Sequence, residues 1–215
     1  MSKYSDEFGA SSFNLDDLLV SNEEVIWRGK PKRFAFIFNT AVTMLPIALL
    51  WIAFDSLMIF MISRSGAVDS IGSPLLMILF FVAFFAIHLT PVWIWVKNVL
   101  TAEKRWQNTE YALTDRRIII MTGFLNMNVD SVFYTDISNV SLKYSFFDKI
   151  LGVGDIYFDL NNATRSFLDL SEAVEIYTMV QKIVMDIQTD IHYPNSYRPE
   201  SNPGYTTKYI YNGDK

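Results

Sequence analysis

Two ionisable side chains lie inside long apolar segments of this 215-residue sequence. Asp55 interrupts the apolar residues 34–62, and His88 lies within residues 74–96, which contain no formally charged side chain. A titratable group in hydrocarbon is costly, so it points to an ion or proton pathway unless a structural role explains it. Helical rise, counted from the segment between the two runs, places Asp55 about 10 Å deep and His88 about 20 Å deep. A direct pair between them therefore requires a register shift of the helices.

A structural role is available for both groups. Asp55 can reach toward the outer interface or Arg64, and His88 can stay neutral and hydrogen-bonded between helices. Pro46 and Pro91 each remove one helical hydrogen bond and so bend the two segments. The sequence leaves two roles open for the two groups: a polar path through the apolar segments, or ordinary helix packing.

Residues that could catalyse a reaction are scarce elsewhere. The sequence has no cysteine, which excludes disulfides, thiolate nucleophiles and most structural zinc sites. Its two histidines are His88 and His192, and neither belongs to a pattern of nucleophile and base or of metal ligands. Residues 152–154 lack the Lys-Ser/Thr ending of a phosphate loop and lead into a strand rather than a helix. We therefore expect no enzyme, no cofactor and no metal.

The two apolar segments have the length of membrane spans. The shorter one, residues 74–96, covers about 34 Å as a helix, against a hydrocarbon thickness of about 30 Å. Basic residues flank the outer ends of the pair, whereas the linker, residues 63–73, is short and balanced in charge. The positive-inside rule then makes both termini cytoplasmic and the linker extracytoplasmic. The sequence predicts a multi-pass protein of the plasma (inner) membrane, with transmembrane helices over 34–62 and 74–96.

Charge is distributed unevenly around these spans. The net charge is −5, and residues 1–24, an expected flexible arm, carry the acidic excess. Residues 25–33 form a basic juxtamembrane segment that is expected to contact anionic lipid at the membrane surface. Its basic side chains are Arg28, Lys30, Lys32 and Arg33. Because this cluster adjoins a span, we expect membrane lipids, and no nucleic acid, as its partner.

Residues 106–190 have the pattern of a small soluble domain. Short segments separated by Asp, Gly and Asn turns predict an antiparallel β structure. The expected strands are residues 109–114, 116–122, 127–134, 138–143, 155–160 and 164–170. A helical turn stopped by Gly152 is expected between the fourth and fifth strands, and a helix capped by Ser171 with one apolar face is expected to pack on the sheet. Residues 191–215 are expected to be a mobile polar tail.

Two motifs, in this order, carry a family resemblance. Residues 111–120 contain Leu-Thr-Asp-Arg-Arg within an apolar strand pattern, and residues 151–156 read Leu-Gly-Val-Gly-Asp-Ile. An upstream Trp-Arg-Gly-Lys-Pro at residues 27–31 extends the similarity. Together they resemble the bacterial pleckstrin-homology-like (PH-like) domain family found on membrane-anchored proteins.

The resemblance implies a membrane α+β fold. A transmembrane helical hairpin is followed by a small, partly open PH-like β barrel of about seven strands with a C-terminal capping helix. One strand is missing from the pattern above. Residues 25–27 are either that strand, paired across the membrane insertion, or a juxtamembrane coil.

The resemblance also implies a non-catalytic binding or assembly module, although the familiar phosphoinositide site does not carry over. That site needs a basic loop between the first strands, and here Arg116 and Arg117 follow Asp115 in a domain with excess acid. Either an arginine pairs with a neighbouring carboxylate, or the two contact an anion or a lipid head group.

Apolar side chains supply further candidate contacts with a partner or with lipid. The strand that contains Ile119 and Met121 is apolar on both faces, so the terminal helix, the membrane or another copy must cover its second face. Phe146 and Phe147 either pack into the core or contact a membrane or a partner.

We therefore expect a membrane-anchored scaffold or accessory protein that binds itself or another membrane protein at the inner face of the membrane. The first alternative is a module that binds anionic lipid. The second is a transporter-associated subunit that uses Asp55 and His88.

Overall fold

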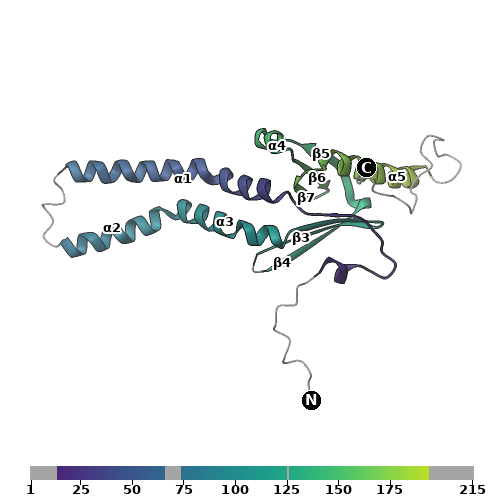
Figure 1. Cartoon of the computed structure of the whole chain (residues 1–215), viewed down its shortest axis with the longest axis horizontal. Coiled ribbons are helices and arrows are strands. Elements are labelled where there is room, and N and C mark those ends of the chain that lie inside the picture. Colours follow the sequence, from purple (N-terminus) through teal and green to yellow (C-terminus); the bar gives the residue numbers. More distant parts are fainter. Residues whose placement is uncertain (1–13, 66–73, 125, 194–215) are drawn as a thin grey trace, which may run out of the picture. The chain divides into compact units, whose positions relative to one another are not determined.

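A computed structural model describes residues 14–65, 74–124 and 126–193 (Figure 1). The chain divides into two compact units. One is helical and covers residues 33–106, and the other combines the segment up to Lys32 with the chain from Gln107 onward. The helical unit is therefore an insertion within the sequence of the second unit. The expected linker at 63–73 and tail at 191–215 lie largely outside the described residues.

Three helices make up the insertion: α1 (Arg33–Arg64), α2 (Pro74–His88) and α3 (Thr90–Gln107). Within the described residues, α1 is long and apolar enough to cross a membrane, and α2 with α3 meets the same measure only when the two are taken as one span. They are bent by 57° where they meet. The second apolar segment is thus two helices rather than the single helix expected over 74–96.

Pro91 explains the position of this break. A proline at position 91 has no N–H to donate to the carbonyl of Ile87, four residues earlier, and its ring disfavours helical geometry at Thr90. The hydroxyl of Thr90 donates to the Ile87 carbonyl instead. Pro46, by contrast, lies inside an unbroken α1. Contacts between helices include a hydrogen bond of 2.8 Å from the indole N–H of Trp95 in α3 to the carbonyl of Ala41 in α1.

The first sheet of the other unit joins strands from both sides of the insertion. Its order is β1 (Val25–Gly29), β2 (Glu110–Thr114), β3 (Arg117–Gly123) and β4 (Met127–Phe133), all antiparallel. In the register of β1 and β2, Gly29 lies opposite Tyr111 and Val25 opposite Thr114. Residues 25–27 are therefore the missing strand and not a coil, and the apolar helices are inserted between the first two strands rather than placed before the domain.

The second sheet contains β5 (Ile137–Lys143), β6 (Gly154–Leu160) and β7 (Thr164–Leu170). Two further helices belong to this unit, α4 (Phe146–Leu151) and α5 (Ala173–His192). The seven described strands match the number that the resemblance implies. They form two separate sheets, so the described strands do not make a closed barrel.

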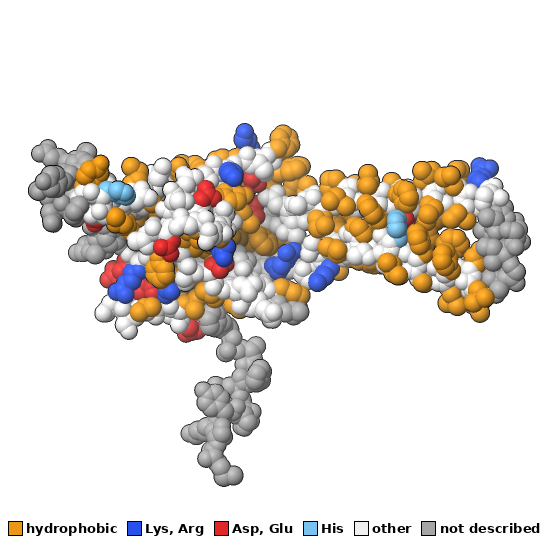
Figure 2. All heavy atoms as spheres, turned by 180° about the vertical axis from the view of Figure 1, so that it is seen from behind, with side chains coloured by type: hydrophobic (Ala, Val, Ile, Leu, Met, Phe, Trp, Pro, Cys, Tyr) orange, Lys and Arg blue, Asp and Glu red, His pale blue; other side chains and the backbone are white. Residues whose placement is uncertain are grey.

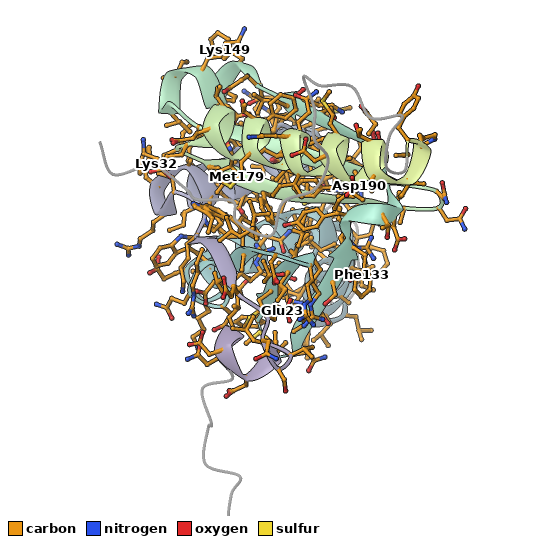
Figure 3. The ribbon with its side chains drawn as sticks, turned by 90° about the vertical axis from the view of Figure 1, so that its right-hand side faces the viewer. Glu23, Lys32, Phe133, Lys149, Met179 and Asp190 are labelled. Atoms are coloured by element: carbon orange, nitrogen blue, oxygen red, sulfur yellow. The ribbon has the colours of Figure 1, made fainter. Side chains whose placement is uncertain are left out.

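One apolar core joins the two sheets and α5. Phe167 of β7 is fully buried and stacks on Tyr111 of β2, and its ring also contacts Trp27 of β1 and Phe158 of β6. Helix α5 lies across the strands (Figure 3). Its buried face consists of Ala173, Ile176, Val180, Ile183 and Val184. No side chain caps the start of α5, so the expected cap by Ser171 is absent.

Gly152 ends α4 in the left-handed region, with φ of 65°. A Cβ at this position would meet no atom within 4 Å, so a substitution costs backbone strain and not a clash. We expect Gly152→Ala to lower the free energy of unfolding by about 1 kcal/mol. Chemical denaturation of the full chain in mild detergent measures this loss. Gly152→Asn, which tolerates positive φ better, should lose less, and equal losses in both variants would contradict the backbone explanation.

Candidate functional site

The second apolar face of β3 is covered by the chain's own N-terminal segment. A 3₁₀ helix, η1 (Leu15–Leu18), places the fully buried Leu15 against Ala112, Ile119 and Met121. The partly buried residues packed on this cluster are Leu18, Leu19 and Val129. We call residues 14–24 the N-terminal cover. The expected flexible arm over 1–24 is wrong for these residues, and residues 1–13 lie outside the described part.

Arg117 fastens the N-terminal cover to the sheet. Its guanidinium donates to both carboxylate oxygens of Glu23, each at 2.9 Å, and to the carbonyl of Leu18 at 2.8 Å. The hydroxyl of Thr114 donates to the same carboxylate at 2.8 Å. The side chain of Glu23 is fully buried. This arginine therefore pairs with a carboxylate of the chain itself, which leaves it unsuited to bind an external anion.

The pKa of Glu23 reflects this arrangement. Burial alone would raise it, but the hydrogen bonds from Arg117, from the Val20 N–H and from the Thr114 hydroxyl outweigh burial and lower the pKa from 4.5 to about 2. A depressed carboxylate pKa stabilises the folded state above the unfolded value of 4.5, and the stabilisation is lost as the pH falls toward about 2.

We expect Glu23→Gln to lower the free energy of unfolding by about 2 kcal/mol at neutral pH, because a charge-assisted bond is lost. The difference in the free energy of unfolding between the variant and the wild-type chain should shrink as the pH falls below 4.5 and nearly vanish near pH 2. Denaturation curves at a series of pH values measure it. Glu24→Gln, the exposed neighbour, serves as the control. A difference that stays constant with pH would contradict the assignment.

Arg116 lies outside this network of buried bonds. Its guanidinium donates to the carbonyl of Asn22 at 3.1 Å and lies 3.7 Å from the carboxylate of Asp115, and about half of the side chain is exposed. The N–H of Asp115 donates to the Glu24 carbonyl, and the N–H of Glu24 donates to the carboxylate of Asp115. Of the two candidate arginines, only Arg116 therefore presents charge to solvent.

The four basic residues of the juxtamembrane segment all make contacts within their own unit. Arg28 pairs with Glu110 and with Asp16 of the N-terminal cover. The ammonium of Lys30 donates to the carbonyl of Gln107, that of Lys32 donates to the carbonyl of Leu151, and Arg33 pairs with Glu103. These contacts hold the chain where it enters and leaves the helical insertion. Lipid contact by these residues stays a prediction.

Phe146 and Phe147 do not form part of the core. Phe146 is 73% exposed and Phe147 37%, and the next turn of α4 adds Ile150 at 66%. The interpretation of the two phenylalanines as core residues is therefore wrong. Sequence reasoning did not single out Ile150. It lies four residues after Phe146, and residues at this spacing share a helix face, so the spacing was an available signal.

The two ionisable groups of the apolar helices come together. Nδ1 of His88 lies 2.7 Å from a carboxylate oxygen of Asp55, although the angle does not satisfy hydrogen-bond geometry. Asp55 is 4% exposed, and the imidazole lies among the rings of Trp51, Phe54 and Phe84. The depth estimate that separated the two groups is wrong. The interpretation in which Asp55 turns to Arg64 is wrong as well.

Sequence reasoning missed two residues that matter here: Leu15 and Glu23. The Leu-Asp-Asp-Leu-Leu run at residues 15–19 repeats leucine at helical spacing, which was a usable signal for a short apolar face. No local pattern marks Glu23. Among the residues that the structure describes, no group of three or more His, Asp or Glu side chains could hold a metal ion.

The sequence and the fold were compared with those of known proteins. The sequence profile of the Bacterial PH domain family matches residues 40–184. A solved structure of a DUF1696 family protein with a pleckstrin-homology domain, from Shewanella loihica, is similar at 15% identity. The similarity covers 36% of this chain and 71% of that one, with a TM-score of 0.30. No curated protein matches the sequence. Because the profile covers more than half of the sequence, the chain belongs to the bacterial PH domain family.

Proposed function

We propose that this protein is a membrane-anchored, non-catalytic PH scaffold that mediates protein–protein assembly at the inner face of the plasma membrane. PH domains are generally non-catalytic interaction modules. The observation that carries the proposal is the pairing of β1 with β2 across the apolar insertion. Residues 30–32 lead into α1 and residues 108–109 lead out of α3, so two short links hold the domain to the helices.

Exposed apolar side chains on the helices support the anchor. Figure 2 shows hydrophobic side chains spread over the helical unit. Leu50, Leu57 and Phe60 of α1 and Leu76 and Phe80 of α2 are each more than half exposed. Apolar surface on this scale needs a cover, and lipid provides one for a helix of this length.

The N-terminal cover supports protein binding by the domain. The outer face of β2 to β4 already holds a short leucine-containing segment through apolar contacts, and Arg117 binds a backbone carbonyl of that segment. A segment from a second copy or from another membrane protein could use the same contacts after the cover leaves. Ile119 and Met121 are buried beneath the cover, so they can meet a partner only through that exchange.

Native mass spectrometry after gentle detergent extraction tests the scaffold. We expect a complex heavier than the single chain of 24.8 kDa, either an oligomer of this chain or a complex with another membrane protein. Leu15→Asp with Leu18→Asp, which loosens the cover, should change the population of that complex, while Leu57→Asn in α1 should leave the domain contacts unchanged. A clean monomer for the wild-type chain would overturn the proposal.

A second candidate is a subunit that moves a proton past Asp55 and His88, favoured by their contact of 2.7 Å between apolar helices. Purified protein in liposomes that enclose a pH-sensitive dye should then leak protons under an imposed potential. Asp55→Asn should abolish that leak. Ser56→Ala, which removes only a hydroxyl bonded to the Ile52 carbonyl, should retain it. Flux no greater than that of empty liposomes would exclude the role.

A further inference from the structure

The exposed apolar side chains of α4 form a patch on the domain surface. We call Phe146, Phe147 and Ile150 the α4 patch. All three are exposed although they are large and apolar, and Phe146 and Ile150 lie on the same helix face one turn apart. Lys149, also exposed, points outward from the same helix (Figure 3).

The helix is built without burying this patch. The hydroxyl of Ser145 accepts the N–H of Asp148 at 3.2 Å, and the carboxylate of Asp148 accepts the N–H of Ser145 at 2.8 Å. Gly152 ends the helix, and the N–H of Val153 donates to the Asp148 carbonyl. Caps at both ends therefore hold α4 in place, and its apolar side chains are presented on a preformed element.

Lys32 ties the end of α4 to the start of the apolar helices. Its ammonium donates to the carbonyl of Leu151 at 2.7 Å, and its backbone N–H donates to the carbonyl of Asp169 at 2.8 Å. Asp169 is held in turn, because its N–H donates to the carboxylate of Asp155 at 2.9 Å. The next residue, Arg33, begins α1. Lys32 thus contacts the last turn of α4 and directly precedes α1 in the chain.

We propose that the α4 patch is a membrane-surface anchor, with Phe146 and Ile150 inserted into the interfacial layer of the leaflet at which α1 begins. This inference rests on the proposed membrane anchor. Residues 30–32 are the short link between the domain and α1, so α4, which Lys32 contacts, stays tethered near the leaflet at which α1 enters the bilayer. Aromatic and aliphatic side chains with a lysine beside them suit that layer, where rings and chains enter and the ammonium stays with the head groups.

Two consequences follow for the domain. It has a third point of attachment besides the links at residues 30–32 and 108–109, so its rotation at the surface is restricted. The strand end formed by Gly29 and Tyr111 lies near these links, whereas Phe133, paired with Arg117 at the other end of the sheet, lies away from them. The face that carries the N-terminal cover is then presented in a defined orientation.

Site-specific fluorescence in vesicles tests this placement. The chain has no cysteine, so Phe146→Cys, Ile150→Cys, Phe133→Cys and Leu57→Cys each create a single labelling site for an environment-sensitive dye. The full-length variants are reconstituted into vesicles of phosphatidylcholine and phosphatidylglycerol that contain lipids with a nitroxide quencher at a shallow or a deep position. Phe133 is the matched control, an exposed aromatic residue of the same domain. Leu57 reports on the membrane anchor itself.

We expect dyes at 146 and 150 to be quenched several-fold more than the dye at 133, by the shallow quencher in preference to the deep one, at a depth of about 5–10 Å. The dye at 57 should be quenched by the nitroxide lipids as well. If 57 is quenched while 146 and 150 match 133, the inference fails and the membrane anchor stands. If 57 is not quenched, the anchor fails as well. A blue-shifted but unquenched dye at 146 and 150 would mean that protein covers the patch, which also overturns the inference.

Discussion

Phe167→Ala is expected to lower the free energy of unfolding by about 4 kcal/mol, the loss typical for removing a buried phenylalanine ring. The ring is fully buried, its centroid lies 4.5 Å from that of Tyr111 and 5.0 Å from that of Phe158, and it also meets Trp27. Its neighbours come from both sheets and from both sides of the helical insertion. Truncation leaves a cavity at the point where these parts meet, and the loss is a large share of a typical domain's stability of about 5–15 kcal/mol.

Urea denaturation of the full chain in mild detergent, followed by far-UV circular dichroism, measures this loss. Phe146→Ala is the matched control, because it removes the same ring from an exposed position. It should change the free energy of unfolding by less than about 0.5 kcal/mol. Similar losses in the two variants would show that Phe167 does not hold the sheets together as described.

Arg117→Leu is expected to cost about 3 kcal/mol, because it leaves the carboxylate of Glu23 buried without its counter-charge. The substitution also frees the Leu18 carbonyl and the Ser131 hydroxyl, which Arg117 contacts at 2.8 and 3.1 Å. The bonds of Arg117 in β3 join two other parts of the fold: Glu23 and Leu18 lie in the N-terminal cover, and Ser131 lies in β4. We therefore expect the cover to detach before the domain unfolds as a whole.

Two measurements separate these effects. Denaturation gives the total loss, and limited proteolysis of the segment before Val25 reports on detachment of the cover. Arg116→Leu is the control, since its side chain is half exposed and its loss should be within about 0.5 kcal/mol. If Arg117→Leu leaves the proteolysis rate of the cover unchanged, the pair with Glu23 does not fasten it.

A loosened cover would also bear on the scaffold proposal. Arg117→Leu leaves Leu15, Leu18 and Leu19 intact but weakens the polar contacts that hold them over Ile119 and Met121. Such a variant keeps the apolar surface and makes it available. If assembly uses this face, the variant should form the complex seen by native mass spectrometry more readily than the wild-type chain does.

Local patterns determined much of the secondary structure. Alternation and turn residues placed six strands within a residue or two of their observed bounds, and Gly152 marked the end of α4 at its true position. Such signals succeed because period, turn chemistry and capping act over a few residues. The break between α2 and α3 was less accessible, since a proline can either bend or end an apolar helix.

Contacts between distant segments were decided by the tertiary structure. Glu23 and Arg117 are 94 positions apart, and β1 meets β2 only across the whole apolar insertion. Asp55 and His88 looked separate because helical rise alone cannot give the offset between two helices. By itself, the sequence determined which segments are apolar, which are strands and which face of each must be covered. Only the folded chain decided which residues do the covering, because the partner of a buried face or charge has no signature within its own few residues.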